Sequence, residues 1–470
     1  MLARMQLWRW SLALCPVVSP AFAQEHEPAD DERNLETAVA AARWIDSLAF
    51  ESDLGLAWRT ALEEEPRLDV SLYSGSPGVV LFLLELARVG GDRAHLERAL
   101  AGADTLLRVV ADESREEPAG LYTGLAGIGA TLTEVWRATG EERYEKGALA
   151  CLDRILATAR ETESGARWND TTDVVSGSAG IGLYLLCAAR AHGRPDAVRV
   201  AQRAGDDLLS IAVERELAAD SAGRPQQLEW DMGTGAATRM PNFSHGTAGV
   251  AAFLVELHRW TGVERYLEAS LAGARSLASL ARTQEAGGRL LPHHVPGGED
   301  LFYLGWCHGP PGTVRLLTAL AEITGSREHD RLADDLVLGL ASSGIPARAP
   351  GFWENAGLCC GNAGVIDFLI ARERLGAGTP RSSELRDELL EDLLARATVD
   401  ELGARWPQAE HRVRPDLVRT QTGLMQGAAG IGLVLLREHL RATGGEPSVR
   451  LPDEAFDFGR YPPPATGGGR

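Results

Sequence analysis

The sequence predicts an all-α protein, an α/α toroid of seven inner and seven outer helices. Three observations predict this class. A Gly-x-x-Gly step followed by an apolar run recurs seven times along the 470 residues. Amphipathic stretches with helical spacing separate these runs, and no stretch of the sequence shows the period-two alternation of a strand. Such repeats bury a core only by packing on their neighbours, so we expect one repeat domain.

Each Gly-x-x-Gly step is expected to begin an inner helix. The run at residues 79–86 is apolar on nearly every face, which is typical of a helix that is buried all round. The first glycines of the seven steps are Gly75, Gly124, Gly177, Gly246, Gly309, Gly361 and Gly427. All seven turns should lie at one rim of a central cavity, where the helix N-termini present unpaired N–H groups and partial positive charge.

The stretches between these runs predict the outer helices. In residues 264–281, for example, apolar residues follow helical spacing and charged residues occupy the other side. The outer helices are expected at residues 35–48, 94–110, 141–159, 196–213, 264–281, 328–340 and 383–397. An open solenoid is the alternative arrangement, but it would expose the apolar inner helices unless both of its ends were capped.

The two ends of the chain differ from this repeat pattern. Residues 1–23 are interpreted as a signal peptide, because Arg4 and Arg9 precede an apolar segment and Ala21 and Ala23 supply the small residues of a cleavage site. Such a signal would export the protein to the periplasm or beyond, and without it the protein would be cytoplasmic. A mis-called start or an amphipathic first helix are the alternatives. The toroid is expected over residues 24–450, and the Pro- and Gly-rich residues 451–470 are expected to be a disordered tail.

Charge and hydropathy exclude two classes of partner. The formal net charge of −19 argues against nucleic acid and against attraction to anionic membranes. No apolar stretch of the sequence is long enough to span a bilayer.

The repeats that deviate from the others mark a candidate site. Cys307, Cys359, Cys360 and His245 stand beside first glycines of their repeats. Because equivalent positions of consecutive repeats lie side by side on a ring, Cys307 can approach the Cys359–Cys360 pair. Three thiolates suit Zn²⁺, which binds sulfur tetrahedrally and keeps a fourth position open in catalytic sites. A disulfide between Cys307 and one of the pair, or buried inert cysteines, are the alternatives.

The chain resembles lanthionine synthetase C-like proteins, the cyclase domains of lanthipeptide biosynthesis and their stand-alone relatives, over residues 35–440. The most specific marks are GWCHGPPG at residues 305–312 and LCCG at residues 358–361. The resemblance implies a zinc cofactor held by Cys307, Cys359 and Cys360. The commoner family pattern has histidine in place of Cys360, and some class II cyclase domains have a similar Cys-Cys-Gly.

The resemblance also implies roles for two catalytic residues. His245 falls on a family histidine proposed for proton transfer, and Asp173 on an aspartate thought to support acid–base chemistry. From the residues alone, His245 could instead be a structural histidine at a helix start, and Asp173 a helix-cap aspartate.

One position departs from many cyclases. Tyr303 stands where they have arginine, and His308 follows Cys307 as in the stand-alone relatives, some of which bind glutathione. This departure weighs against intramolecular ring formation and leaves the zinc site unaffected. His293, His294 and His308 are interpreted as ordinary polar loop residues.

The leading functional hypothesis is zinc-dependent addition of a thiol to dehydroalanine or dehydrobutyrine in a peptide. The thiol would be a peptide cysteine or a small thiol such as glutathione. No dehydratase-like segment is recognisable, so a separate dehydratase is expected to make the substrate. The alternatives are a non-catalytic zinc- or thiol-binding toroid and a glycan-processing α/α toroid that uses paired carboxylates. Asp170 and Asp173 lie close in sequence, but no second carboxylate stands convincingly at another repeat's turn.

Overall fold

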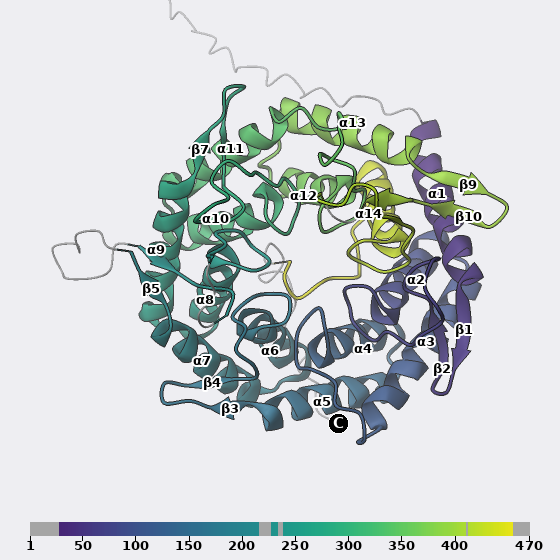
Figure 1. Cartoon of the computed structure of the whole chain (residues 1–470). Helices are drawn as coiled ribbons and strands as arrows, with labels where there is room; N and C mark the ends of the chain where they lie inside the picture. The colour runs from purple at the N-terminus through teal and green to yellow at the C-terminus, as the bar shows by residue number, and fades with distance from the viewer. Residues whose placement is uncertain (1–27, 216–226, 234–237, 410–411, 455–470) are drawn as a thin grey trace, which may run out of the picture.

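The computed structural model describes residues 28–215, 227–233, 238–409 and 412–454, and the predicted signal peptide at residues 1–23 lies outside them. In this part of the chain, fourteen helices form a closed double ring, with the inner helices around the centre and the outer helices around them (Figure 1). The predicted α/α toroid is therefore confirmed. None of the helices in these ranges combines the length and the apolar composition needed to cross a membrane.

The inner ring consists of the helices that follow the glycine steps. Each packs on the next, and the last packs on the first, which closes the ring. In the first of them, every residue from Ser76 to Leu86 is buried, as expected for a helix covered on all sides. The inner helices are α2 (Ser76–Gly90), α4 (Leu125–Thr139), α6 (Ser178–His192), α8 (Thr247–Thr261), α10 (Pro310–Thr324), α12 (Asn362–Arg374) and α14 (Ala428–Thr443).

All seven predicted outer helices are present. They are α1 (Pro28–Ser47), α3 (Arg93–Ala111), α5 (Glu142–Thr158), α7 (Pro195–Ser210), α9 (Glu264–Leu280), α11 (Arg327–Ala341) and α13 (Pro380–Ala395). Helix α13 begins earlier than predicted because Thr379 and Ser382 form a capping box at its start. Six outer helices pack on the inner helix that precedes them, whereas α1 packs on α14, so the first described helix completes the last hairpin.

The described residues also form six short antiparallel hairpins that the sequence did not predict. Their strands have two to four residues, which is too short to show a period-two pattern. The pairs are β1 (Ala49–Ser52) with β2 (Gly55–Trp58), β3 (Arg160–Glu161) with β4 (Ala166–Arg167), β5 (Val213–Glu214) with β6 (Leu228–Glu229), β7 (Arg282–Thr283) with β8 (Arg289–Leu290), β9 (Thr398–Asp400) with β10 (Gly403–Arg405), and β11 (Gln408–Ala409) with β12 (Val418–Arg419).

The seven turns that precede the inner helices are joined by a closed ring of backbone hydrogen bonds. In each bond, a residue just before a first glycine donates its N–H to a carbonyl of the next repeat, over 2.8–3.2 Å. The donor and acceptor pairs are Tyr73 and Tyr122, Tyr122 and Val175, Val174 and Ser244, Ser244 and Cys307, Cys307 and Cys359, Cys359 and Met425, and Met425 and Tyr73. All seven turns therefore lie side by side at one rim, as predicted.

Glycine is required in these turns because the backbone folds back tightly on itself. A Cβ atom at Gly246 would lie 1.6 Å from the carbonyl oxygen of Met240. At the second glycine of a step, a Cβ atom on Gly312 would lie 2.2 Å from the carbonyl oxygen of Trp306. A side chain at either position would force the turn open and move its neighbours in the hydrogen-bonded ring.

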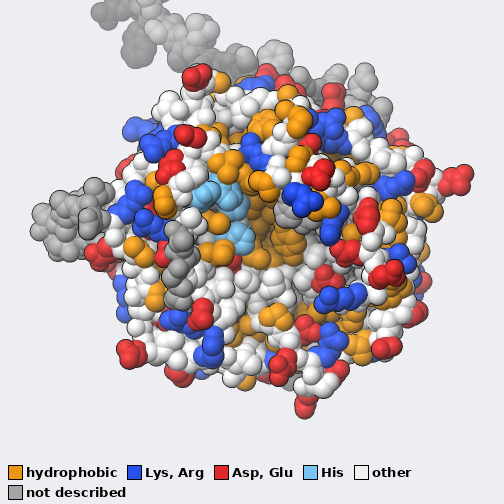
Figure 2. All heavy atoms as spheres, viewed as in Figure 1, with side chains coloured by type: hydrophobic (Ala, Val, Ile, Leu, Met, Phe, Trp, Pro, Cys, Tyr) orange, Lys and Arg blue, Asp and Glu red, His pale blue; other side chains and the backbone are white. Residues whose placement is uncertain are grey.

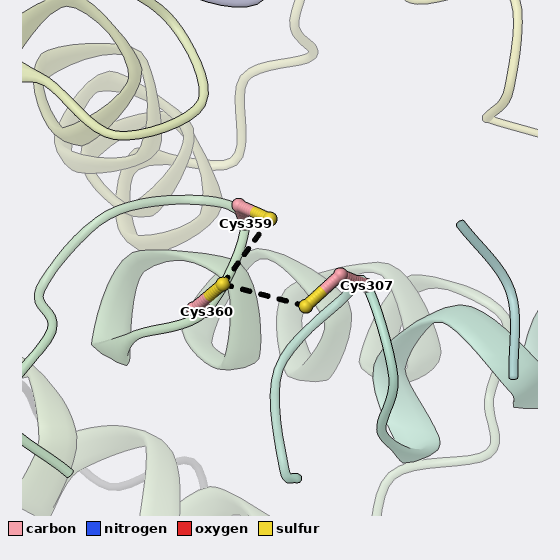
Figure 3. A group of neighbouring side chains, drawn as sticks. All are labelled: Cys307, Cys359 and Cys360. Carbon is pink, nitrogen blue, oxygen red and sulfur yellow. Dashed lines mark hydrogen bonds between the residues drawn. The ribbon is translucent and has the colours of Figure 1, made fainter. Parts of the chain in front are cut away.

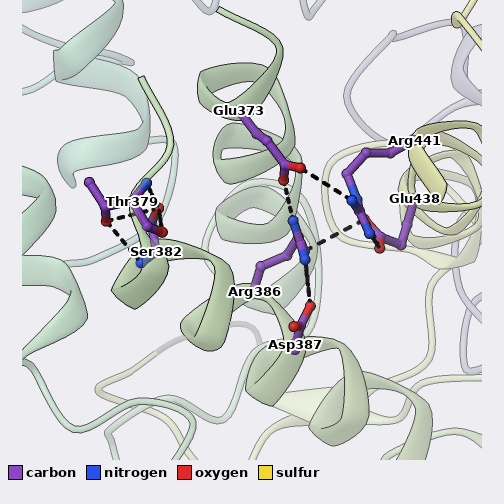
Figure 4. A network of polar contacts seen from close by, with 7 residues as sticks. All are labelled: Glu373, Thr379, Ser382, Arg386, Asp387, Glu438 and Arg441. Carbon is purple, nitrogen blue, oxygen red and sulfur yellow. Dashed lines mark hydrogen bonds and ion pairs between the residues drawn. The ribbon is translucent and has the colours of Figure 1, made fainter. Parts of the chain in front are cut away.

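A network of charged side chains joins the last three helices of the ring (Figure 4). Arg386 on α13 pairs with Glu373 on α12 and contacts Glu438 on α14 at 3.9 Å. Arg441 on α14 pairs with Glu373 at 3.2 Å and with Glu438 at 2.8 Å. The Arg386 and Glu438 side chains are each 4% exposed, so these charges stabilise the fold only because they are paired.

The chain after α14 enters the ring, where the sequence predicted a disordered tail from residue 451. Residues 446–454 cross the centre of the toroid (Figure 1), and Leu451, Pro452 and Asp453 are buried. The structured domain thus extends at least to residue 454, because polar side chains inside the ring bind this segment. Residues 455–470 lie outside the described part of the chain.

The side chain of Glu256 on α8 is fully buried, and neither of its oxygens accepts a hydrogen bond from the described residues. Its ionisation therefore reports on the packing of the inner ring. Burial raises the pKa of Glu256 from 4.5 to about 7, although Arg259 lies 3.6 Å away. The folded protein therefore holds this proton more tightly than the unfolded chain does. The contribution of this protonation to the free energy of unfolding is fully present below about pH 4.5 and is lost as the pH rises through about 7.

The free energy of unfolding of the parent should fall between pH 5 and pH 8 as Glu256 ionises. We predict that this fall is about 2 kcal/mol smaller in the Glu256→Gln protein, because glutamine carries no charge to desolvate. Urea unfolding at both pH values measures the difference. The control is Glu142→Gln, which removes a carboxylate whose side chain is 80% exposed. An unchanged pH dependence in the Glu256→Gln protein would contradict this assignment.

Candidate metal centre

Three cysteines from two neighbouring turns meet at the rim of the toroid. Cys307 precedes α10, and Cys359 and Cys360 precede α12 (Figure 3). The Cys360 sulfur lies 3.3 Å from that of Cys307 and 3.2 Å from that of Cys359, and all three sulfurs lie within 4.8 Å of one another. The backbone N–H of Cys307 donates to the carbonyl of Cys359, which fixes the two turns in this register. The structure thus brings together all three predicted ligands.

The geometry and chemistry of this cluster fit a soft divalent metal. The sulfur separations are far longer than the roughly 2.05 Å of a disulfide, so none of the three cysteines is in a disulfide here. Sulfurs bound tetrahedrally to zinc at about 2.3 Å lie about 3.8 Å apart, so small side-chain rotations would open the cluster for an ion. Hydrogen bonds with Cys359 and Cys360, together with burial, raise the pKa of Cys307 well above its usual value. A cation among the sulfurs would offset that cost of ionisation.

Polar side chains from the first and last repeats surround the cysteines. The side-chain amide of Gln426 donates to the Cys360 sulfur at 3.7 Å and to the Tyr73 hydroxyl at 3.1 Å. Asn355 holds that amide by donating to its oxygen at 2.8 Å. Such outer partners orient metal ligands. The sequence pattern did not single them out, although Tyr73 and Gln426 occupy the repeat positions of Cys307 and Cys360.

Asp173 binds both its own turn and His245. One carboxylate oxygen accepts the backbone N–H groups of Ser176 and Gly177, each at 2.8 Å, and the other lies 2.6 Å from His245 Nδ1. Asp173 thus holds the turn that precedes α6, whose N-cap residue is Gly177, and the same carboxylate also orients the histidine. His245 lines the same cavity as the cysteines. Because its Nδ1 atom is hydrogen-bonded to Asp173, its Nε2 atom is left to interact with a molecule in that cavity.

Three further histidines lie beside His245, although the sequence analysis interpreted them as ordinary loop residues. The His308 ring lies 5.7 Å from that of His245 and 4.2 Å from that of His293, and His293 Nδ1 lies 2.9 Å from Nδ1 of His294. Figure 2 shows histidine side chains gathered beside the central hollow. His308 is buried, and its Nδ1 has no hydrogen-bond partner among the described residues.

The burial of this histidine cluster keeps two of its members neutral. Burial, together with the positive charge of the nearby histidines and Arg412, lowers the pKa of His293 to about 4. Burial also lowers the pKa of His308 well below its usual value, with a contribution from the neighbouring histidines. The His293 and His308 imidazoles beside His245 are therefore polar but uncharged at neutral pH.

The cavity beside the cysteines has a volume of about 240 Å³ and aromatic walls. The Arg412 guanidinium lies 5.1 Å from the centre of the Tyr303 ring and 5.3 Å from that of Phe352. It also donates to the carbonyls of Phe302, at 2.7 Å, and Gly351. Tyr303 occupies the position that is arginine in many cyclases, according to the resemblance. In this chain Arg412, from another repeat, supplies a cation to the cavity wall.

The fold and the site together define a closed helical toroid with a three-cysteine cluster and a histidine–aspartate pair at one rim. The sequence family described as lanthionine synthetase C-like protein matches residues 66–441. The chain belongs to this family.

Comparison with solved structures agrees on the fold. Nisin cyclase superposes with a TM-score of 0.61 at 17% identity, covering 91% of this chain and 98% of that chain. More distant matches are a sugar epimerase from a ruminal bacterium (TM-score 0.47, 12% identity, 89% of this chain and 100% of that chain) and an inactive variant of an α-1,6-mannanase of Salegentibacter sp. HEL1_6 in complex with α-1,6-mannotriose (TM-score 0.44, 11% identity, 87% and 99%). A search of curated protein sequences gave no match.

We predict that the His293 imidazole titrates with a midpoint near pH 4 and is neutral at pH 6, because burial disfavours its charged form. NMR of protein labelled with ¹⁵N-histidine, with His293→Gln used to assign the signal, measures the midpoint. A midpoint at the ordinary histidine value of about 6.5 would contradict the buried cluster.

Proposed function

We propose that the protein binds one zinc ion through Cys307, Cys359 and Cys360 and adds a thiol to dehydroalanine or dehydrobutyrine in a peptide. The observation that carries the proposal is the three-thiol cluster, placed in one cavity with a histidine that a buried carboxylate orients. Membership of the lanthionine synthetase C-like family supports it. The similar fold of nisin cyclase, a cyclase by name, supports a peptide as the substrate.

The cysteines would hold the ion and leave one position for the substrate. Bound zinc lowers the pKa of a thiol in that position, so the thiol is present as a thiolate at neutral pH. The half-buried Cys360 and the cavity in front of it leave room for the incoming sulfur, whereas Cys307 and Cys359 are each 5% exposed.

The reaction forms one C–S bond and moves one proton. The thiol sulfur bonds to the β-carbon of the dehydro residue, the electron pair of the C=C bond moves towards the carbonyl as an enolate, and a proton then adds to the α-carbon. His245, which lines the same cavity, would take the proton of the thiol and return it to the enolate through Nε2. Asp173 holds Nδ1, so it fixes the ring and the tautomer that this exchange needs.

The cavity wall would position the dehydro residue. The rings of Phe302, Tyr303 and Phe352 offer flat apolar surface for the planar C=C–C=O group, and Arg412 keeps the loops that carry them together. The substrate would come from a separate dehydratase, since the reaction consumes a dehydro residue that must first be made from serine or threonine.

We predict that the purified protein contains one zinc per chain and that Cys307→Ala loses it. The control is Cys151→Ala, which removes a fully buried cysteine on α5 whose pKa burial raises to about 12. Metal analysis after gel filtration measures the content, with circular dichroism to check folding. Equal zinc in the two variants would refute the ligand assignment.

We predict that His245→Ala lowers the rate of thiol addition by about a hundredfold or more while zinc and fold are retained, as is typical for loss of a general acid–base. Addition of a small thiol to a dehydroalanine peptide is the assay. If the zinc-loaded parent added none of several thiols to any of several peptides, the protein would instead be a non-catalytic zinc- or thiol-binding toroid.

We predict that Asp173→Asn separates the two roles of Asp173. The asparagine oxygen can still accept the N–H groups of Ser176 and Gly177, so the turn should persist and stability should change by less than about 1 kcal/mol. Its amide would donate to His245 Nδ1 and reverse the tautomer, so thiol addition should slow at least tenfold. Normal kinetics in a stable Asp173→Asn protein would limit Asp173 to holding the turn before α6.

A further inference from the structure

We propose that Asp453 is a positioning residue for the metal centre. Its buried carboxylate binds the Trp306 side chain and thereby holds the turn that carries Cys307. The inference rests on the proposed function only in taking Cys307 as a zinc ligand. Neither the sequence pattern nor the family resemblance pointed to this residue.

Asp453 belongs to a C-terminal strap, residues 446–454, which is bound along its length to the inner helices. Glu85 on α2 accepts the backbone N–H groups of Ser448, at 3.0 Å, and Val449, at 3.1 Å. Arg437 on α14 donates to the Val449 carbonyl at 3.3 Å and pairs with Glu454 at 2.7 Å. These contacts bring Asp453 to a fixed place inside the ring.

At that place Asp453 accepts hydrogen bonds from three side chains. The donors are the Tyr122 hydroxyl at 2.8 Å, Trp306 Nε1 at 3.0 Å and Arg315 Nη1 at 3.1 Å. Asp453 is 2% exposed, and Arg315 also donates to its backbone carbonyl at 2.6 Å. A buried carboxylate with a paired arginine and two further donors is costly to remove, because the Tyr122 hydroxyl and the Trp306 N–H would lose this acceptor and Arg315 would lose its ion pair.

Trp306 connects this carboxylate to the candidate metal centre. It is the residue before Cys307 and is 4% exposed. Its ring packs edge to face against Tyr122, at 5.3 Å between ring centres, and against Phe243, at 5.6 Å. Phe243 lies two residues before His245, so the same aromatic cluster supports both the cysteine turn and the histidine turn.

Loss of the carboxylate should therefore loosen the cysteine cluster more than it disturbs the rest of the fold. Without the Asp453 carboxylate, the indole N–H loses its acceptor, and because Trp306 directly precedes Cys307, a displacement of the Trp306 ring should also move the Cys307 turn. Outer partners that orient metal ligands typically change metal affinity by about 10–100-fold when removed. We expect an effect of that size on zinc release.

The test is the rate at which the zinc-loaded, full-length protein transfers its metal to excess chelator. Asp453→Ala should release zinc at least tenfold faster than the parent. The matched control is Glu454→Ala, which truncates the next strap residue and leaves Arg437 paired with Asp367 at 2.7 Å. Among the described residues, the Glu454 side chain accepts hydrogen bonds from Arg437 and the Leu451 N–H and none from Trp306. Its variant should therefore release zinc within about twofold of the parent rate, even if both variants lose similar thermal stability.

Trp306→Phe is a second variant that keeps an aromatic ring in the cluster and removes the N–H donor. It should also speed zinc release, and the double variant with Asp453→Ala should add little, because both changes break the same hydrogen bond. Equal release rates for Asp453→Ala and Glu454→Ala would overturn the proposal, as would fully additive effects in the double variant.

Failure of the zinc assignment itself would appear differently. If the parent bound no zinc, the alkylation rates of Cys307 and Cys359 in metal-free protein, resolved by mass spectrometry, would report on the same turn. The proposal then predicts faster alkylation of Cys307 relative to Cys359 in Asp453→Ala but not in Glu454→Ala. An unchanged ratio would reject the positioning role independently of any metal.

Discussion

The closed ring of backbone hydrogen bonds between the seven turns is the constraint on which the site depends. It places Cys307 between Ser244 and Cys359, with one hydrogen bond to each. Residues that are more than fifty positions apart in the chain thereby become neighbours at a separation set by the backbone. The glycines of each step permit this geometry, because a Cβ atom there would collide with the backbone of the same turn.

A ring of this kind holds its geometry only while it is closed. The packing of α14 on α2 closes the inner ring, and both ends of the described chain add to this closure: α1 packs on α14, and the strap after α14 returns through the centre. Because the strap reaches the side chain next to Cys307, the last described residues contribute to the same rim as the middle of the chain. Closure of the fold and geometry of the candidate site are thus linked through Trp306.

The repeat pattern was sufficient to predict the fold, the order of inner and outer helices and the meeting of Cys307 with Cys359 and Cys360. These follow from equivalent positions in consecutive repeats, which the sequence displays directly. His293, Arg412 and Asp453 could not be predicted in this way, since they come from loops and a strap that do not repeat. Their places depend on tertiary contacts, such as the stacking of Arg412 between two aromatic rings. The composition of residues 451–470 suggested disorder, yet buried donors inside the ring hold the first four of them.

The central claim is that three cysteines bind zinc and leave its fourth position to a substrate thiol. X-ray absorption spectroscopy at the zinc edge, on the purified full-length protein, tests this claim most directly. The account predicts three sulfur ligands at about 2.3 Å and one oxygen or nitrogen ligand, which a fourth sulfur replaces when excess small thiol is added. A zinc ion with four sulfur ligands before thiol addition, or one whose ligands do not change on addition, would contradict the account.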